Sequence, residues 1–137
     1  MHKYPEVFID NIPVGLNHKP KFIAEIGVNH LGSFDRAIEL VNAAHNNGAD
    51  FLKLQTYKSE KRYDRNTNPK ADLFIKNLSK WELSREQEKE VWDHAKSIGA
   101  KVFTSCFDVD SIEFAESLGC IAYKIAAFEV RNLELIR

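Results

Sequence analysis

Phe22-Ile23-Ala24-Glu25-Ile26-Gly27-Val28-Asn29-His30 is the stretch to which the other patterns of the chain relate. A run of apolar residues that ends in Gly, Asn and His is typical of a buried strand that opens into a polar loop. A carboxylate within such a strand must be paired, hydrogen-bonded or shifted in pKa. Glu25 is therefore expected in a functional site or in a buried polar network, and matching polar residues elsewhere in the chain favour the site.

Helix and strand signals alternate after this stretch. Periodicity and capping residues predict helices from Ser33 to Gly48, from the capping box of Ser84 and Gln87 to Gly99, and from Asp110 to Gly119, with a fourth helix beginning at Leu133. Apolar runs predict strands over residues 51–57, 102–107 and 122–128. The order βαβαβαβ with every strand buried predicts a parallel sheet with helices on one or both faces.

Two segments lie outside this alternation. Residues 7–9 and 12–14, joined by Asp10-Asn11, are expected to form a short antiparallel hairpin because Asp and Asn tolerate the positive φ of a tight turn. Residues 58–83 form a long charged connection with a helical turn predicted at residues 73–75. Connections of this length are usually lids, binding loops or disordered segments, and a mobile surface loop is as well supported as a lid.

Length and composition exclude several classes of protein. With 137 residues, 44% of them hydrophobic, the chain can bury one core, so we expect a single domain over residues 1–137, with the hairpin in residues 1–20 and βα units in residues 21–137. A net charge of -1 gives no overall field for nucleic acid or an anionic membrane. The N-terminus Met1–Pro5 lacks the apolar core of a signal peptide, which predicts a cytoplasmic protein. Cys106 and Cys120 have no metal or redox spacing and are interpreted as small buried hydrophobes.

A weak repeat suggests where polar side chains gather. Each of Gly48, Gly99 and Gly119 ends a predicted helix, and five residues later stand Lys53, Thr104 and Lys124. These three are expected at one height on one face of the sheet, with their neighbours Leu52, Leu54, Phe103, Tyr123 and Ile125 on the opposite, helix-covered face. In a (β/α)₈ barrel the polar face would be the interior near the carboxyl-terminal mouth, where active sites lie.

Together with Glu25, Gln55 and Ser105, these residues would form an anion site with an acid beside it, because lysines supply positive charge and hydroxyls supply neutral donors. Two alternatives stay open on the pattern alone. A buried lysine could be a Schiff-base nucleophile with a lowered pKa, or it could be the structural partner of Glu25.

Four motifs in order resemble the N-terminal half of the sialic acid synthase family, which includes synthases of N-acetylneuraminate, legionaminate and pseudaminate. They are the stretch from Phe22 to His30, Lys53-Leu54-Gln55, the segment from Phe103 to Asp108, and the segment from Tyr123 to Glu129. The resemblance covers about residues 20 to 137. It implies a (β/α)₈ barrel that condenses phosphoenolpyruvate with the open-chain aldehyde of an N-acetylated hexosamine such as N-acetylmannosamine, which releases phosphate and gives a nine-carbon 2-keto acid.

The resemblance also implies roles for individual residues. Lys53 and Lys124 would hold the phosphate and carboxylate of phosphoenolpyruvate, with Ser105 and Thr104 as hydroxyl donors. Glu25 and Glu129 would be the catalytic acids, one at the amino sugar and one near the reacting centre. Asn29, His30 and Gln55 would lie on the sugar side or shape the loop.

The family's divalent ion, Mn²⁺ or Mg²⁺, is implied for the full-length protein, with its histidines in the second half of the barrel. No two of His2, His18, His30, His45 and His94 have the spacing of a metal pair, so we expect no metal ligands in this chain. The chain is expected to be half a barrel, inactive alone, with exposed strand edges through which it forms a homodimer or associates. The alternatives are another phosphoenolpyruvate-dependent 3-deoxy keto acid synthase and a non-catalytic half-barrel that binds an anion or a sugar.

Overall fold

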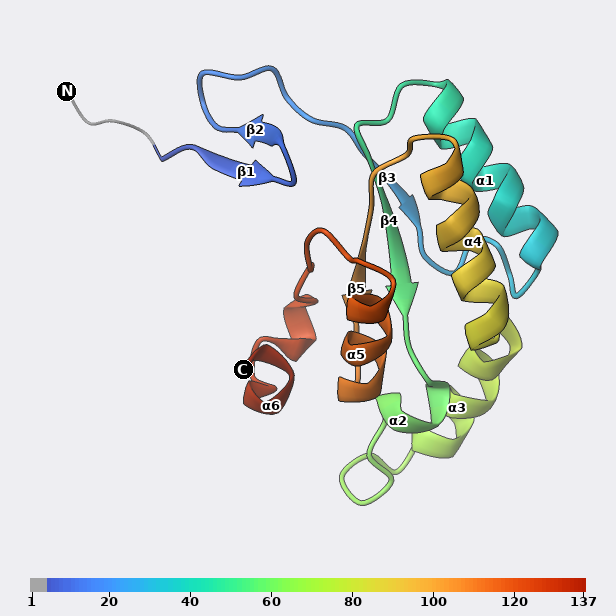
Figure 1. Ribbon diagram of the computed structural model, residues 1–137. Helices are drawn as coiled ribbons and strands as arrows, with labels where there is room; N and C mark the ends of the chain where they lie inside the picture. The colour runs from blue at the N-terminus through green and yellow to red at the C-terminus, as the bar shows by residue number, and fades with distance from the viewer. Residues whose placement is uncertain (1–4) are drawn as a thin grey trace.

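A parallel three-stranded sheet with helices packed on one side forms the centre of the computed structural model, and an antiparallel hairpin lies beyond the sheet's amino-terminal end (Figure 1). The structure describes residues 5–137. His2 lies outside the described part, and so do residues 1–4, on which the expected absence of a signal peptide depends. The strands are β1 (Val7–Ile9), β2 (Ile12–Val14), β3 (Ile23–Ile26), β4 (Phe51–Thr56) and β5 (Val102–Cys106). The helices are α1 (Phe34–Asn46), α2 (Ser59–Arg62), α3 (Ala71–Leu78), α4 (Arg85–Ser97), α5 (Val109–Ser117) and α6 (Leu133–Ile136), with 3₁₀ turns at Ser79–Trp81 and Ala127–Glu129.

The helix starts follow the capping signals with one exception. Ser33 caps α1, accepting a hydrogen bond from the backbone N–H of Arg36, and the predicted capping box of Ser84 and Gln87 begins α4. The prediction that Asp110 caps the third helix is wrong, because Asp108 does so. Asp108 has the extended backbone that a cap residue needs, whereas Asp110 already lies in the first helical turn.

The parallel register gives the sheet two chemically different faces. Glu25 lies opposite Lys53, and Gln55 lies opposite Ser105. Because side chains alternate along a strand, these four residues share one face, which we call the helix-free face. The other face, here called the helix-covered face, packs against α1 and α4 in the main core. That core contains Ile26, Ala37, Val41, Leu52, Leu54, Val91, Trp92, Ala95, Val102 and Leu118.

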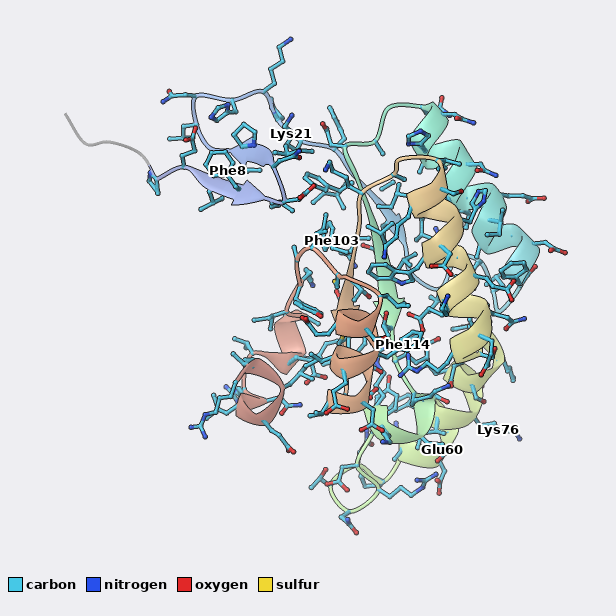
Figure 2. All side chains as sticks on the ribbon, viewed as in Figure 1. Phe8, Lys21, Glu60, Lys76, Phe103 and Phe114 are labelled. Atoms are coloured by element: carbon cyan, nitrogen blue, oxygen red, sulfur yellow. The ribbon has the colours of Figure 1, made fainter. Side chains whose placement is uncertain are left out.

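Phe103 lies on the helix-free face, so its predicted place under the helices is wrong. It is opposite Lys53 in the register, and Figure 2 shows it on the side of β5 away from α4. Its ring packs edge to face on that of Phe51, with centroids 6.1 Å apart and planes at 79°. Both rings are buried, which the simple alternation of polar and apolar residues did not indicate.

The strand expected from Phe22 onward is an edge strand and not a buried one. The exposed fractions of Phe22 and Ile23 are 72% and 49%, and the Glu25 side chain is 52% exposed. In residues 5–137, β3 pairs only with β4. Apolar composition predicted the strand correctly, but burial depends on a neighbour that composition does not reveal.

The fourth strand expected over residues 122–128 is reduced to a single bridge between Thr104 and Tyr123. One ladder hydrogen bond fixes it there, from the N–H of Lys124 to the carbonyl of Thr104 at 3.0 Å. Within the described residues this segment has a neighbour on one side only, so nothing else holds it extended before the 3₁₀ turn at 127–129. The structure therefore shows three strands and a bridge instead of four strands.

The connection over residues 58–83 is folded into two short helices. It contains α2 and α3, and Ala71 and Ile75 of α3 are buried. In Figure 1 both helices lie beyond the arrowhead of β4, at the carboxyl end of the sheet. Glu82 accepts hydrogen bonds from the N–H of Ser59 at 2.8 Å and from Nζ of Lys58 at 2.9 Å, so the two ends of the connection are joined.

The predicted hairpin is confirmed, with Asp10 at a φ of 54° in the turn. Lys101, just before β5, reaches both Asp10 and Asn11 and so ties the hairpin to the sheet. Across residues 5–137, none of the helices combines the length and the apolar character needed to span a membrane.

Candidate functional site

Lys53 is the centre of a polar cluster on the helix-free face. Its ammonium nitrogen lies 2.8 Å from the carboxylate of Glu25 on β3 and 3.4 Å from Oγ of Ser105 on β5. The Lys53 side chain is only 11% exposed, whereas that of Glu25 is 52% exposed. Three adjacent strands thus place a partly desolvated cation between an accessible acid and a hydroxyl, a grouping suited to binding an oxyanion.

Gln55 extends the cluster toward the carboxyl end of β4. Its Nε2 lies 3.4 Å from Oε1 of Glu25. The close approach depends on Gly27, where an added Cβ would lie 2.8 Å from that nitrogen and 3.1 Å from the Glu25 oxygen. Glycine at this position therefore leaves the room that the Gln55 amide occupies.

Asn29 and His30, two of the three residues predicted on the sugar side, shape the loop after β3. The side-chain amide of Asn29 donates to the carbonyl of Glu25 at 3.0 Å, and Nδ1 of His30 accepts from the N–H of Gly32 at 3.1 Å. Burial lowers the pKa of His30, so the imidazole is neutral in the folded protein near pH 7. His30 and Asn29 hold the loop, and within residues 5–137 neither side chain contacts Lys53.

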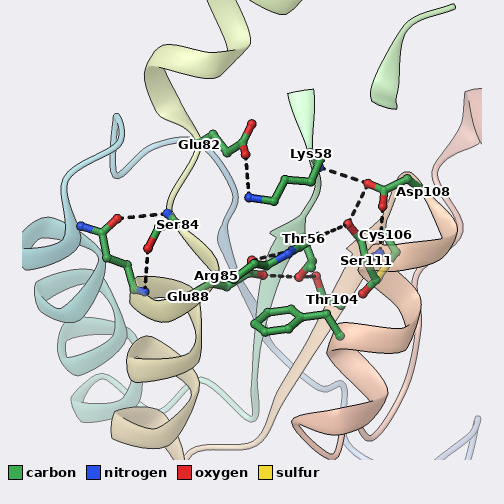
Figure 3. Close-up of polar contacts among 12 residues, drawn as sticks. Thr56, Lys58, Glu82, Ser84, Arg85, Glu88, Thr104, Cys106, Asp108 and Ser111 are labelled. Atoms are coloured by element: carbon green, nitrogen blue, oxygen red, sulfur yellow. Dashed lines mark hydrogen bonds and ion pairs between the residues drawn. The ribbon is translucent and has the colours of Figure 1, made fainter. Parts of the chain in front are cut away.

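Thr104 does not join the cluster, so the expectation that it shares a face and height with Lys53 is wrong. It lies opposite Leu54 in the register and therefore belongs to the helix-covered face. Its hydroxyl lies 2.9 Å from that of Thr56, which in turn donates to Glu88 (Figure 3). The five-residue repeat failed here because the strands are offset by one position relative to the preceding glycines.

Lys124 and Glu129 lie farther along the chain, and within the described residues neither side chain hydrogen-bonds to Lys53, Glu25, Gln55 or Ser105. Lys124 is exposed, and within the described residues its side chain forms no hydrogen bond or ion pair. Glu129 is buried and accepts a hydrogen bond from Asn132 at 2.9 Å. The structure thus brings together Glu25, Lys53, Gln55 and Ser105, and leaves Lys124 and Glu129 outside this cluster.

A second polar network, which the sequence did not predict, lies on the helix-covered face (Figure 3). Arg85 donates to Glu88 at 3.0 Å and to Ser111 at 2.6 Å, and Ser111 donates to Asp108 at 2.7 Å. Burial raises the pKa of Glu88 despite its hydrogen bond from Thr56 and the nearby charge of Arg85. The spacing of Arg85 and Glu88 on one helical face was the signal available, but such pairs are common on exposed helices.

A divalent ion does not fit the side chains of the described residues. Among residues 5–137 no three His, Cys, Asp or Glu side chains lie together as metal ligands would. Both cysteines are free thiols there, and burial raises the pKa of Cys106 to about 12, which keeps that thiol protonated. No chemical step is therefore assigned to a metal held by these residues.

Comparison with known proteins gives a consistent result. The sequence profile described as the NeuB family matches residues 40–137. The pseudaminic acid synthase of Helicobacter pylori is 34% identical over 129 residues, which cover 85% of this chain and 37% of the relative. The N,N'-diacetyllegionaminic acid synthase of Legionella pneumophila is 36% identical over 124 residues, which cover 84% of this chain and 35% of the relative.

A solved structure extends the likeness to the fold. The N-acetylneuraminic acid (sialic acid) synthetase from Leptospira borgpetersenii, in complex with citrate, superposes with a TM-score of 0.85 at 26% identity, over 99% of this chain and 46% of that one. The chain thus spans between a third and a half of the length of these proteins. The resemblance inferred from the four motifs is confirmed, and the chain belongs to the NeuB family.

Proposed function

We propose that this chain is the phosphoenolpyruvate-binding part of a synthase of the sialic acid type. The enzyme would condense phosphoenolpyruvate with an N-acetylated hexosamine, form a nine-carbon 2-keto acid and release phosphate. The observation that carries the proposal is the contact of Lys53 with both Glu25 and Ser105 in a chain of the NeuB family. Curated relatives are named as synthases of pseudaminic and legionaminic acids.

Lys53 would bind an oxyanion of phosphoenolpyruvate. Its low exposure strengthens the attraction, because a charge removed from water is screened less. Ser105 supplies a neutral donor beside it, and Lys124 would add a second cation from the next segment of the sheet. Holding a trianionic substrate in this way fixes its position and offsets negative charge on the departing phosphate.

Glu25 would serve the sugar end of the reaction. Its carboxylate is accessible while it contacts Lys53, so it can exchange that contact for hydroxyl or amide groups of a hexosamine when an anion neutralises the lysine. Gln55 is placed to donate to the same carboxylate or to the sugar. Glu129 would approach the reacting centre only if its segment completes a fourth strand.

The rest of the catalytic machinery would come from outside residues 5–137. The helix-free face would become the interior of a (β/α)₈ barrel once further βα units, or a second copy of the chain, pair with the exposed edge of β3 and with the segment near Tyr123. A divalent ion that polarises the sugar aldehyde would be bound by those further parts. The chain alone is expected to bind anions weakly and to show no turnover.

The test is phosphate release by the intact protein with phosphoenolpyruvate, Mn²⁺ and a panel of N-acetylhexosamines. We expect release with one hexosamine and about a 100-fold loss of kcat/KM in Lys53→Ala, since the removed charge acts on the departing phosphate. Lys89→Ala is the matched control, because Lys89 pairs with Asp93 on the exposed side of α4. Release with a pentose or tetrose phosphate instead would indicate a 3-deoxy keto acid synthase, and binding without release would indicate a non-catalytic protein.

A further inference from the structure

Arg62, the last residue of α2, lies among three aromatic rings at the carboxyl end of the sheet. Its guanidinium carbon lies 3.8 Å from the ring centre of Phe107 and 5.4 Å and 5.5 Å from those of Tyr57 and Phe128. The rings of Phe107 and Phe128 are themselves stacked, with centroids 5.7 Å apart. A guanidinium packed against aromatic rings can still donate from the N–H groups at its edge.

Those N–H groups are not used by the protein. Within residues 5–137 Arg62 forms no ion pair and donates no hydrogen bond. Its Nε is buried without a partner, whereas its two terminal nitrogens are accessible. Two other arginines of the chain differ. Arg65 pairs with Glu60 and Asp72, and Arg85 pairs with Glu88.

One acid lies near Arg62 without pairing to it. Glu129 is close enough for its charge to favour the protonated guanidinium, but burial still lowers the pKa of Arg62 overall. The carboxylate of Glu129 accepts its hydrogen bond from Asn132 instead. Arg62 is half-buried, and the terminal N–H groups that the described residues leave unused are free to donate to a group from outside. An oxyanion is the acceptor that best matches a charged, planar guanidinium.

The aromatic residues also place Arg62 over the Lys53 cluster. Tyr57 follows Gln55 by two positions at the end of β4, and Phe107 follows Ser105 by two positions at the end of β5. Two residues of extended chain rise roughly 7 Å. Arg62 therefore lies beyond the cluster by about the length of a small phosphorylated acid, on the side from which a substrate would enter.

We propose that Arg62 is a further substrate-binding residue, whose free guanidinium edge donates to a carboxylate or phosphate oxyanion while the rings of Tyr57, Phe107 and Phe128 hold it in place. This inference rests on the proposed function for the identity of the substrate. It assigns to the folded connection over residues 58–83 a direct role in binding, and it makes α2 the element that carries a cation to the mouth of the site.

The experiment is calorimetric titration of the intact protein with phosphoenolpyruvate, pyruvate and inorganic phosphate. Arg62→Met keeps an apolar stem among the rings but removes every donor, and we expect phosphoenolpyruvate to bind about 10- to 100-fold more weakly. Arg65→Met, in an exposed pair on the same connection, should leave binding unchanged. Weakened binding of pyruvate would identify the carboxylate as the group bound, and weakened binding of phosphate would identify the phosphoryl group.

Thermal melting separates binding from a purely structural role of the aromatic stack. If Arg62→Met lowers the melting temperature but leaves all three affinities equal to wild type, Arg62 only packs and the proposal is overturned. If the wild type binds none of the three anions, the proposal is likewise overturned. The proposed function fails separately: oxyanion binding that depends on Arg62, with no phosphate released from any sugar, would keep the arginine site and remove the synthase.

Discussion

Thr104 and Ser105 are neighbours on β5, and they show how the two faces of the sheet differ. Both hydroxyls are buried. That of Thr104 faces the helices and lies 2.9 Å from Thr56, in a network closed by Glu88 and Arg85. That of Ser105 faces the other way and lies 3.4 Å from Nζ of Lys53.

The difference shows that one step along a strand separates polar groups that bond to one another from polar groups that stay partly accessible. In the network of Thr56, Thr104 and Glu88 on the helix-covered face, the side chains hydrogen-bond to one another. On the helix-free face the cation of Lys53 is shared with an exposed acid and a distant hydroxyl, so an incoming anion can compete for it. Substitutions on the two faces should therefore separate stability from binding.

The largest expected effect is on the helix-covered face. Trp92 is fully buried in the core, and Trp92→Ala should lower the free energy of unfolding by about 3 to 5 kcal/mol. Ile23 lies on the helix-free face and is 49% exposed, so Ile23→Ala should lower the free energy of unfolding by only about 1 kcal/mol. Urea unfolding of the chain measures both, and equal losses would contradict the assignment of the core to one face.

A backbone change in the loop that crosses between the faces should come next. Gly32 has a φ of 78°, and an added Cβ would lie well inside van der Waals contact with the carbonyl oxygen of Lys80. Gly32→Ala should cost more than about 2 kcal/mol, because the strain of a positive φ adds to a clash with backbone. Gly48→Ala, with a φ of 83° and open space around it, should show only the strain, about 1 kcal/mol. Similar losses in both would argue against the contact with Lys80.

Thr104→Val and Ser105→Ala test the comparison directly. Removing the Thr104 hydroxyl should lower stability by about 1 kcal/mol, because Thr56 loses a buried partner, and should leave phosphoenolpyruvate binding unchanged. Removing the Ser105 hydroxyl should weaken phosphoenolpyruvate binding and leave stability unchanged. Unfolding measures the stability of both variants, and titration measures their phosphoenolpyruvate binding. Weaker binding in Thr104→Val alone would reverse the assignment of the faces.

The smallest effect concerns pH and His30. Burial places its folded pKa below the usual 6.5, so below that pH the unfolded chain binds the proton more readily and stability falls. We expect His30→Asn, whose amide can still accept from Gly32, to lose less stability than wild type between pH 7.5 and pH 5.5. The same slope in both proteins would show that His30 is not responsible.

Local signals predicted most of the elements, because caps and periodicity depend on nearby residues. Ser33, Ser84 and Gln87 act as predicted, and the contact of Lys53 with Glu25 follows from two strands being adjacent. The quoted motifs were enough to predict the family, which the comparisons confirm.

Register and neighbours could not be predicted in this way. Thr104 was assigned to the wrong face because counting from Gly99 gives a height but not the offset between strands. The burial of Phe51 and the exposure of Ile23, two residues paired across β3 and β4, depend on what lies over each of them. Arg62 gave no signal at all, since a single arginine in a charged connection resembles any solvated one.

The joined ends of the connection over residues 58–83 have a consequence for how such a protein can change. Glu82 accepts from Lys58 and Ser59, so the start of the connection, just after β4, lies beside its end, just before α4. Lengthening a loop whose ends already meet adds little closure entropy, about 0.6 kcal/mol for each doubling. The segment between these residues can thus be replaced or extended as a unit while the strands and Lys53 keep their places.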